Sequence, residues 1–540
     1  MRLSDQTIFQ QAVVRRESRH YPITYYNITS SGIERISGRE MNAIVSRYVS
    51  MLKNLGVRPG DTVALSGANC AEHAAIDNAI GLVGATSVPI YYTTPAEEIE
   101  MLLCKSQARW FFVGDERVMQ NLPSDLPEVE IIPFGNVSSP SGTGALCFGT
   151  KEGETPNATD KPSGVCASPL LATIRYTSGT TGEPKGVMFC FNQLKWMGEV
   201  LTNLLSWRDC NREMRYLSFL PMSHVVEGIL AAYAPYCMLC KAKIYYLNDF
   251  QKLTCALPHV RPTVFFSVPR FYEKLWEQMA KNSLGRYYLK MDDGWKKKLV
   301  GKVLRHAVLR KAGLDQCAQL LVGSAPVSEE LLLRFRELGI EIYNAYGQTE
   351  APLITLNRLG DNTIPSVGTP LPDTSVTIAP DGELLVTGPQ VAQGYYRLDV
   401  DTFDEGVLHT GDLGRIDGNG HVFISGRKKD MLITSYRKNI NCSKVEERLC
   451  NIECVSHAVL VGEQRPYCTA LLWTEGPTDG LEAEVEQMNS SLSHPEQVKR
   501  WRIIDTPLNI GRGELTPNLK VKRSVVISNY QKEIEKMYAD

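Results

Sequence analysis

The first 135 residues alternate between helix-like and strand-like patterns, and this alternation restricts the fold more than any other feature of the sequence. Residues Arg39 to Leu55 have the spacing of an amphipathic helix, and Arg58-Pro-Gly-Asp61 is a turn pattern that leads into a strand at Thr62–Leu65. A second helical pattern at Ala71–Gly84 precedes a strand-like run at Thr86–Tyr92. Such alternation is typical of an α/β fold with mostly parallel strands.

A chain of 540 residues is too long for one compact core, so we expect two or more domains. The segment Val137–Ser168 is poor in large apolar residues and predicts an exposed connection. Regular patterning resumes at Leu170 and includes a predicted helix at Ser328–Leu338 and a strand at Ile340–Tyr343. A charged segment, Gly426–Asp430, precedes a smaller unit with predicted strands at Ala458–Val461 and Thr469–Trp473. We therefore predict a large N-terminal domain of α/β sheets at 1–426, a hinge at 427–430 and a smaller, mobile C-terminal α+β domain at 431–540.

The composition indicates an ordinary globular protein rather than a nucleic-acid binder, because 58 Lys and Arg are balanced by 60 Asp and Glu. The N-terminus has no apolar block of the signal-peptide type. The most apolar stretch, Gly228–Cys240, is broken by Pro235 and falls short of the roughly 18 to 20 residues that cross a bilayer. We interpret it as a buried helix. The expected location is cytoplasmic, with peripheral membrane contact as an open alternative.

Fourteen cysteines lie scattered without a disulfide framework, as is typical of a reducing compartment. The single CxxC, Cys237–Cys240, has no matching second pair, so we do not predict a zinc site. The segment Trp295–Lys311, WKKKLVGKVLRHAVLRK, is basic and roughly amphipathic. A solvated helix face is the favoured interpretation, and a membrane-surface or lid role is the alternative.

The segment Tyr176 to Val187, YTSGTTGEPKGV, follows a strand-like run at Leu171–Tyr176 and has the residue types of a phosphate-binding loop. Glycines let successive backbone N–H groups point inward, and hydroxyl groups add donors without bulk. Lys185 supplies a mobile positive charge for terminal phosphates. The order differs from a Walker loop, because a glycine follows the lysine and the hydroxyl cluster precedes it.

This string resembles the signature loop of the adenylate-forming superfamily, which includes acyl-CoA synthetases, firefly-type luciferases and peptide-synthetase adenylation domains. The resemblance covers nearly the whole chain, from about Ile33 to Ile527, and implies a set of ATP-binding residues. In the loop these are Thr177, Ser178, Gly179, Thr180, Thr181, Gly182 and Lys185.

Asn344 to Glu350, NAYGQTE, resembles the second core motif of the same superfamily. The resemblance implies that Tyr346 stacks on adenine, that Gly347 is also a nucleotide-binding residue, and that Thr349 bonds the α-phosphate. Glu350 is implied to hold Mg²⁺ together with Thr177, and a carboxylate with phosphate oxygens suits this hard cation. An upstream turn resembles the lining of the adenine pocket and consists of Gly323, Ser324, Ala325 and Pro326.

His409 to Gly414, HTGDLG, resembles the ribose motif. Asp412 is expected to accept hydrogen bonds from both ribose hydroxyls, and Arg427 to reach the same ribose. The tail Gly513 to Arg523 resembles the catalytic-lysine motif of long-chain acyl-CoA synthetases, in which Lys520 bridges acid and phosphate. Lys522 is the competing candidate. Cations are needed there because a carboxylate must approach a triphosphate.

Three further segments resemble the long-chain branch. Pro221 to Val225 matches the motif whose histidine, His224, lies beside the acyl carboxylate, and similar likeness holds for Ser267–Lys274 and Pro95–Ile99. The implied reaction consumes ATP with Mg²⁺ and a carboxylic acid, forms acyl-AMP and pyrophosphate, and transfers the acyl group to coenzyme A. The family's small domain rotates between these halves about a hinge residue, which is Lys429 here.

The sequence departs from the long-chain pattern just after the hinge. Relatives usually have a Ser-Asn-Gly-Glu-Asn-like loop, whereas this chain has Ser435-Tyr436-Arg437-Lys438-Asn439, with added bulk and two positive charges. The stretch between Lys274 and Leu320 also looks shorter than in many long-chain members.

Three hypotheses follow from these resemblances. The first is a medium- or long-chain acyl-CoA synthetase, and the second is an acyl-AMP ligase that loads an acyl carrier protein. The third is a non-catalytic acyl or nucleotide binder, which the presence of Lys185, Glu350, Asp412 and Lys520 argues against.

Overall fold

The alternating segment at the N-terminus forms a six-stranded sheet in the computed structural model, which describes residues 7–122, 128–135, 137, 171–177, 183–204, 213–400, 402–515 and 521–539. Every neighbouring pair is parallel except the last, so the predicted parallel sheet is confirmed. In spatial order the strands are β6 (Glu130–Pro133), β5 (Trp110–Gly114), β3 (Thr62–Gly67), β4 (Thr86–Ile90), β7 (Leu171–Thr177) and β8 (Lys185–Cys190).

The helices that precede and connect these strands include the two predicted at Arg39–Leu55 and Ala71–Gly84. The first begins where Ser37 and Glu40 form a reciprocal capping box, which satisfies two backbone N–H groups that the first helical turn leaves free. The predicted connection at Val137–Ser168 lies outside the described residues apart from Val137. The helices are α2 (Gly38–Asn54), α3 (Ala71–Leu82), α4 (Ala96–Ser106) and α5 (Glu116–Asn121).

A second sheet of four strands joins distant parts of the sequence. Its order is β2 (Gly32–Ser37), β1 (Ile23–Thr29), β10 (Ala242–Leu247) and β9 (Met214–Ser218). The antiparallel hairpin β1–β2 was not predicted, and β1 pairs in parallel with β10 more than 200 residues away. Long-range pairing of this kind leaves no periodic signal in either segment alone.

A third sheet follows, and its first three strands are parallel. Its order is β11 (Val264–Ser267), β12 (Gln319–Val322), β13 (Ile342–Gln348), β14 (Ala351–Leu356) and β15 (Thr369–Pro370). The predicted helix at Ser328–Leu338 is confirmed as α13 (Glu329–Glu337), with Ser328 as its N-cap. The predicted strand at Ile340 is confirmed as β13, two residues later.

The apolar stretch Gly228–Cys240 is mostly buried as predicted, although Leu239 is 76% exposed, and it belongs to two short helices rather than one. Pro235 lies in the first turn of the second, where its missing N–H costs no hydrogen bond. The helices of this part of the chain are α1 (Ile8–Arg16), α6 (Phe191–Leu204), α7 (Val225–Ala232), α8 (Ala234–Cys237), α9 (Leu253–Val260), α10 (Pro269–Lys281), α11 (Ser283–Leu289) and α12 (Trp295–Lys311), with a short 3₁₀ turn η3 (Phe250–Lys252).

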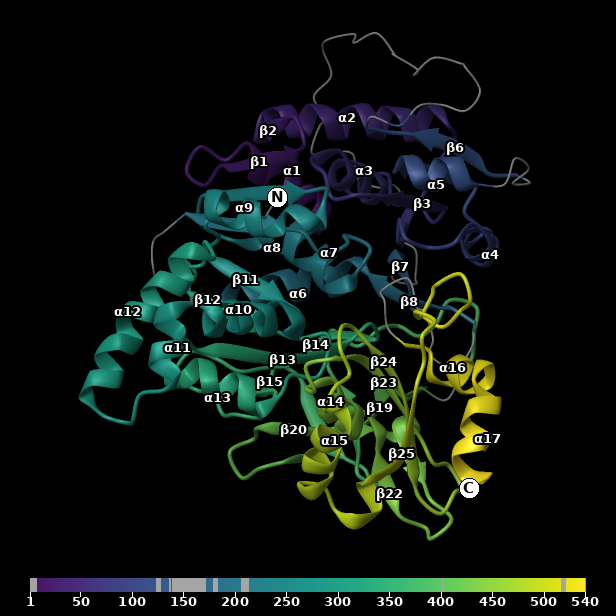
Figure 1. Cartoon of the computed structure of the whole chain (residues 1–540). Coiled ribbons are helices and arrows are strands. Elements are labelled where there is room, and N and C mark those ends of the chain that lie inside the picture. The colour runs from purple at the N-terminus through teal and green to yellow at the C-terminus, as the bar shows by residue number, and fades with distance from the viewer. Residues whose placement is uncertain are drawn as a thin grey trace.

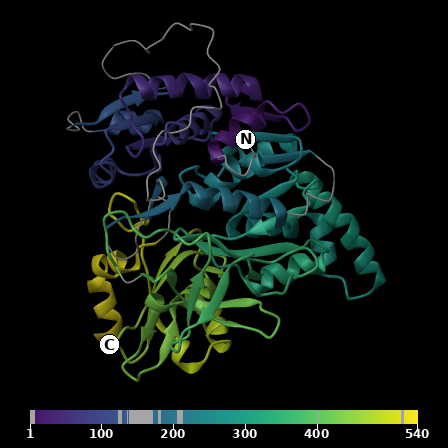
Figure 2. The same ribbon diagram turned by 180° about the vertical axis from the view of Figure 1, so that it is seen from behind.

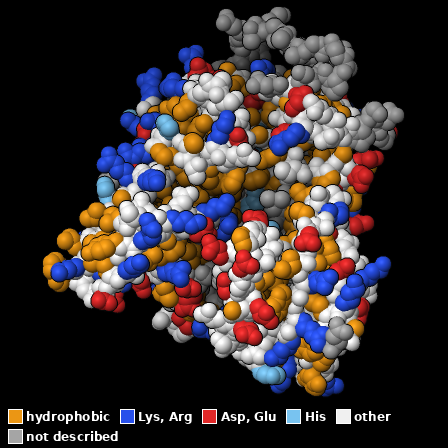
Figure 3. All heavy atoms as spheres, in the orientation of Figure 1, with side chains coloured by type: hydrophobic (Ala, Val, Ile, Leu, Met, Phe, Trp, Pro, Cys, Tyr) orange, Lys and Arg blue, Asp and Glu red, His pale blue; other side chains and the backbone are white. Residues whose placement is uncertain are grey.

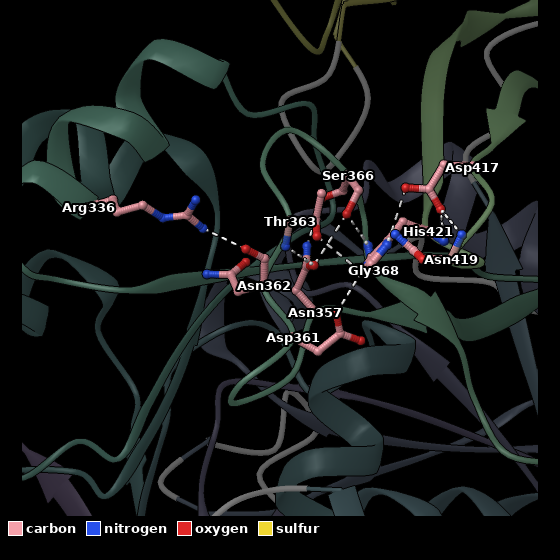
Figure 4. Close-up of polar contacts among 10 residues, drawn as sticks. All are labelled: Arg336, Asn357, Asp361, Asn362, Thr363, Ser366, Gly368, Asp417, Asn419 and His421. Carbon is pink, nitrogen blue, oxygen red and sulfur yellow. Dashed lines mark hydrogen bonds and ion pairs between the residues drawn. The ribbon is translucent and has the colours of Figure 1, made fainter.

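A smaller sheet completes the large domain, in the order β16 (Ser375–Ile378), β17 (Glu383–Thr387), β19 (Val407–Ile416) and β18 (Phe403–Asp404), with β20 (Val422–Arg427) also paired to β19. Figure 4 shows the polar contacts that attach it to the third sheet. Asn357 donates to the Ser366 carbonyl at 2.7 Å, and His421 Nε2 lies 2.7 Å from Asp361 Oδ1. The loop after β14 is thereby fixed against the start of β20.

The C-terminal unit has its own core, in which successive residues of β23 and β24 face opposite sides of the sheet. Leu460 and Leu472 pack on one side, and Val459 and Leu471 on the other. Both predicted strands, at Ala458 and Thr469, are confirmed. Its elements are η4 (Lys428–Asp430), β21 (Met431–Ile433), β22 (Asn439–Asn441), α14 (Cys442–Cys450), β23 (Val455–Val461), β24 (Cys468–Thr474), α15 (Leu481–Ser490), η5 (His494–Glu496), β25 (Val498–Ile503), α16 (Arg523–Asn529) and α17 (Gln531–Ala539).

Figure 1 shows the N-terminal sheet at the top, helices α10 to α13 on the left flank and the C-terminal unit at the lower right. Figure 2 shows the molecule from behind, so the N-terminal sheet is again at the top while the left and right sides are exchanged. The predicted α/β class, with a large N-terminal domain and a smaller C-terminal domain, is confirmed. In the ranges that the structure describes, every helix is too short or too polar to cross a membrane.

Candidate active site

The predicted adenine turn and the second core motif meet at the carboxyl edge of the third sheet. Ser267, Val322 and Asn344 are aligned on the parallel strands β11, β12 and β13, and the chain leaves β12 at Gly323. A Cβ atom at Gly323 would lie 2.9 Å from the Ala345 carbonyl oxygen, so only glycine fits there. Ligands of open α/β sheets bind at this edge of the strands, because the crossover loops leave a crevice there.

Tyr346 joins this edge to the predicted ribose motif. Its hydroxyl donates to Asp412 Oδ2 at 2.5 Å, and Arg427 Nε donates to the other oxygen, Oδ1, at 3.0 Å. Asp412 and Arg427 are directly opposite on β19 and β20, so the sheet register itself brings the pair together. The structure thus assembles three residues that lie 66 and 15 positions apart in the sequence.

Burial makes this carboxylate unusual. The Asp412 side chain is 5% exposed, whereas that of Arg427 is 51% exposed. The aspartate is therefore buried while the arginine reaches solvent. Burial raises the pKa of Asp412, and the nearby Arg427 charge opposes that rise. Burial and the Asp412 charge together hold the pKa of Tyr346 well above its ordinary value, so this hydroxyl remains a donor.

Glu350 lies in the tight turn between β13 and β14, next to Thr349. The Tyr395 hydroxyl donates to Glu350 Oε1 at 2.7 Å, and the Ala392 N–H donates to the Glu350 carbonyl at 2.8 Å. The turn itself is tight, because a Cβ at Gly347 would lie 2.4 Å from the carbonyl oxygen of Pro352 on β14. The carboxylate is therefore fixed by both its side chain and its backbone.

Lys185 is placed by the same tyrosine. Its Nζ lies 4.9 Å from the centre of the Tyr395 ring, a cation–π contact, and Tyr395 pairs with Val187 of β8. Thr177 is directly opposite Lys185 on β7 and β8, so the two ends of the phosphate loop meet. Tyr395 thus connects the loop lysine with the candidate magnesium carboxylate. The predicted loop residues between them lie outside the described residues: Ser178, Gly179, Thr180, Thr181 and Gly182.

His224 is the N-cap of α7, where its Nδ1 accepts a hydrogen bond from the Val226 N–H at 3.3 Å. When this ring is neutral, its proton therefore sits on Nε2. The cap is a structural role, which is common for a lone histidine. It also fixes the orientation of the ring.

Arg175 is a positioning residue that the sequence motifs did not reveal. It precedes Thr177 by two residues on β7, it is buried, and its Nη1 donates to the carbonyls of Met222 at 3.1 Å and Ser223 at 2.9 Å. The strand that leads into the phosphate loop thereby holds the turn that carries His224. Neither Arg175 nor Tyr395 stands in a spacing pattern that a single sequence could flag.

Lys428, the residue after Arg427, is still attached to the large domain. Lys428 forms ion pairs with Asp381 at 2.5 Å and Glu383 at 3.1 Å, and the predicted hinge residue Lys429 follows within η4. Beyond Lys429, β21 and β22 form a hairpin. Its tip carries the loop Ser435–Asn439, which differs from the long-chain pattern. Tyr436 there is 72% exposed.

Arg437 at this tip has a φ of 56°, in the left-handed region that favours glycine. This conformation would suit the glycine that the long-chain pattern has at this position, whereas this chain has an arginine. Lys520 lies outside the described residues.

Mg²⁺ usually takes one or two carboxylates and several phosphate or water oxygens. Within the described ranges, no group of three or more His, Cys, Asp or Glu side chains could hold a metal. Glu350, with one oxygen oriented by Tyr395, suits a magnesium ion whose other ligands come from ATP.

Comparison with known proteins agrees with these features. The AMP-binding enzyme family model matches residues 9–396, and the AMP-binding enzyme C-terminal domain matches residues 429–540. The long-chain-fatty-acid–CoA ligase FadD15 of Mycobacterium tuberculosis is 32% identical and covers 90% of this chain and 89% of its own. The long-chain-fatty-acid–CoA ligase ACSBG2 of Homo sapiens is 26% identical and covers 91% of this chain and 86% of its own.

Solved structures share the fold at low identity. The anthranilate CoA ligase AuaEII with anthranoyl-AMP has a TM-score of 0.75 at 18% identity and covers 99% of this chain and 100% of its own. The A domain of carboxylic acid reductase from Segniliparus rugosus, with AMP and a carboxylic acid, has a TM-score of 0.76 at 18% identity and covers 100% of this chain and 95% of its own. The chain therefore belongs to the AMP-binding enzyme family, as its resemblance to the adenylate-forming superfamily predicted.

Proposed function

We propose that the protein is an AMP-forming ligase that activates a medium- or long-chain fatty acid with ATP and transfers the acyl group to coenzyme A. The observation that carries the proposal is the convergence of Tyr346 and Arg427 on Asp412, beside the Lys185–Tyr395–Glu350 contacts. Relatives named as long-chain-fatty-acid–CoA ligases, at up to 32% identity over 90% of the chain, support the acid class.

Asp412 is proposed to hold the ribose. Its two oxygens accept from Tyr346 and Arg427, and each carboxylate oxygen can accept a second hydrogen bond from a sugar hydroxyl. Tyr346 and Gly347, with the turn at Gly323 to Pro326, are proposed to enclose the adenine, because they lie together at the carboxyl edge of β12 and β13.

The phosphates are proposed to extend toward Lys185, Thr349 and Glu350. Lys185 neutralises part of the polyphosphate charge, and bound Mg²⁺, held through Glu350 and Thr177, supplies further charge neutralisation. The acid's carboxylate attacks the α-phosphorus, a new P–O bond forms, and the bond to pyrophosphate breaks. Lys520, and alternatively Lys522, is proposed to bring the carboxylate and the α-phosphate together.

The acid is proposed to approach from the side of His224. Nδ1 accepts from the Val226 N–H, so a neutral His224 ring carries its proton on Nε2, which would donate to the carboxylate. In the second half-reaction the thiolate sulfur attacks the acyl carbonyl, a C–S bond forms, and AMP departs as the C–O bond breaks. Rotation about Lys429 is proposed to separate the two halves.

One observation favours a second candidate acceptor, an acyl carrier protein. The exposed loop with Tyr436, Arg437 and Lys438 presents two cations in place of the glycine and glutamate of the long-chain pattern. An anionic carrier-protein surface would meet such a loop favourably. The phosphates of coenzyme A would also do so, which is why the acceptor needs a direct assay.

The test is ATP–pyrophosphate exchange with a panel of acids of increasing chain length, followed by thioester analysis. Exchange with fatty acids and acyl-CoA formation are expected. Absence of exchange with every acid would refute both ligase proposals, and exchange without acyl-CoA would favour the carrier protein. Lys520→Ala should abolish exchange but spare thioester formation from supplied acyl-AMP, with Lys522→Ala as the matched variant; the reverse pattern would assign the role to Lys522.

We further propose that the enzyme is cytoplasmic and contacts membranes peripherally, where its fatty-acid substrates concentrate.

A further inference from the structure

We propose that the helical hairpin α11–α12 is a docking surface for an anionic lipid bilayer. Helix α12 carries three large apolar side chains at four-residue spacing, so they form one stripe along the helix. Trp295 is 72% exposed, and Leu299 and Val303 are each 58% exposed. Tyr287 and Leu289 at the end of α11 continue the exposed apolar surface.

The stripe is not the side on which α12 packs. The opposite side of the helix is buried through Gly301 and Leu304, and Leu304 belongs to the core beneath. Gly301 allows close contact, because a Cβ there would lie 3.1 Å from the Tyr288 ring. The helix is therefore fixed by one face and presents its apolar stripe outward.

Cations border the stripe on both sides. Helical spacing places Lys298, Lys302 and Arg305 along one edge and Lys296 and Arg310 along the other, and all five are exposed. Residues 286–311 contain nine Lys and Arg against two Asp, in a chain whose overall charge is −2. Figure 3 shows apolar and basic side chains together on this left flank.

The two acidic residues do not cancel this charge. Asp293 pairs with Lys297 at 2.8 Å, which removes one cation and one anion from the balance. Asp292 lies in the turn between the helices and leaves a single opposing charge. No residue of the candidate nucleotide site lies on α11 or α12.

This combination matches the chemistry of an anionic membrane surface. Apolar side chains with a tryptophan insert at the boundary of headgroups and acyl chains, while lysines reach the anionic headgroups. A second copy of this chain is a poorer occupant, because two such basic faces would repel each other.

The test is co-sedimentation of the full chain with vesicles of phosphatidylcholine alone or with added phosphatidylglycerol. Binding is expected only with phosphatidylglycerol and should weaken as salt is raised. Lys298→Glu/Lys302→Glu should lower the partition coefficient roughly tenfold or more, since each surface cation contributes about 1 kcal/mol. Lys532→Glu/Lys536→Glu, an exposed pair at the same spacing on α17, is the matched control and should bind like the wild type.

The apolar stripe is tested separately with Trp295→Ser/Leu299→Ser/Val303→Ser, which should also lose binding, whereas Leu359→Ser, at another exposed leucine, should not. Emission assigned to Trp295, by difference from Trp295→Phe, should shift to the blue on vesicles. ATP–pyrophosphate exchange with a short, water-soluble acid should be unchanged in all variants, because no residue of the candidate nucleotide site lies on α11 or α12.

Equal binding to both vesicle types, or binding that the α12 variants leave intact, would overturn the proposal. A wild-type dimer that dissociates on removal of the stripe would also overturn it and assign the face to a second copy. These readouts need no catalysis, so their failure is distinct from failure of the proposed ligase activity.

Discussion

Asp412 and Arg427 are direct partners across β19 and β20, and Arg427 Nε donates to Asp412 Oδ1 at 3.0 Å. The pair is closed on its other side by the Tyr346 hydroxyl. An ion pair this asymmetric in exposure leaves the arginine free to turn toward a ligand while the aspartate stays fixed.

Asp412→Asn should lower kcat/KM for ATP by about 10- to 100-fold in pyrophosphate exchange. The amide keeps the size of the side chain but loses the charge, and hydrogen bonds to charged groups contribute about 1.5–3 kcal/mol. Asp381→Asn, at an exposed aspartate paired with Lys428, is the control and should retain ATP affinity. Equal losses in both variants would refute the ribose role.

Tyr395→Phe should raise the Mg²⁺ concentration needed for half-maximal exchange by roughly fivefold. Phenylalanine retains the ring beneath Lys185 but removes the hydrogen bond that orients Glu350, worth about 1 kcal/mol. Tyr396→Phe is the neighbouring control. An unchanged Mg²⁺ dependence in Tyr395→Phe would show that Glu350 is oriented without the hydroxyl.

Arg175→Met should raise KM for the acid more than KM for ATP. The buried carbonyls of Met222 and Ser223 would lose their donor, at a cost of about 1–3 kcal/mol in stability, and the His224 turn would lose its attachment. Arg175→Lys restores the charge but offers a single point of donation, so a partial rescue of the acid KM is expected. A merely structural arginine would lower stability and leave the ratio of the two KM values unchanged.

Glu227→Gln should remove a pH dependence of folding stability. Burial raises the pKa of Glu227 to about 8, from an ordinary value near 4.5, so between these values the folded state holds a proton that the unfolded state has released. Wild-type stability from this group is therefore lost as pH rises through that window, by up to about 1.4 kcal/mol per pH unit.

Denaturant unfolding from pH 5 to 8 measures this effect. The free energy of unfolding of the wild type should fall relative to that of Glu227→Gln as the pH rises. Glu482→Gln, on the exposed side of α15, should follow the wild type. A constant difference between wild type and Glu227→Gln would show that Glu227 is ionised throughout.

Arg437→Gly should accelerate thioester formation from supplied acyl-AMP and coenzyme A several-fold, because it removes bulk from the loop tip. The free energy of unfolding should change by no more than about 1 kcal/mol, since relief of the left-handed strain is offset by a more flexible unfolded chain. Gln464→Gly, at a φ of 54° in the adjacent turn, tests backbone relief alone. Equal acceleration in both variants would exclude a specific role for the Arg437 side chain.

The local pattern of apolar and polar residues predicted many of the helices and strands. It did not predict which strands pair when they lie far apart in the sequence. The helix at Ala71 and the strand at Thr62 carry their signals in their own residues. The partner of β1 is β10, and only the folded chain reveals that Tyr25 lies beside Ile244.

The candidate site divides in the same way. Asp412, Glu350 and Lys185 stand in motifs with recognisable spacing. Tyr395 and Arg175 act on those residues from positions that carry no motif, and their importance follows from a ring position or a buried guanidinium. Such supporting contacts depend on tertiary packing. They leave no motif with a fixed spacing in a single sequence.

The anchoring of Lys428 to Asp381 and Glu383 has a consequence for the order of events. A pivot at Lys429 would begin one residue beyond this anchor, so the Asp412–Arg427 pair would keep its place at every angle of the small domain. The ribose would then contact the same residues, Asp412 and Arg427, in both half-reactions. Pyrophosphate would leave first and AMP last, and the adenylate would stay tethered while its second reactant arrives.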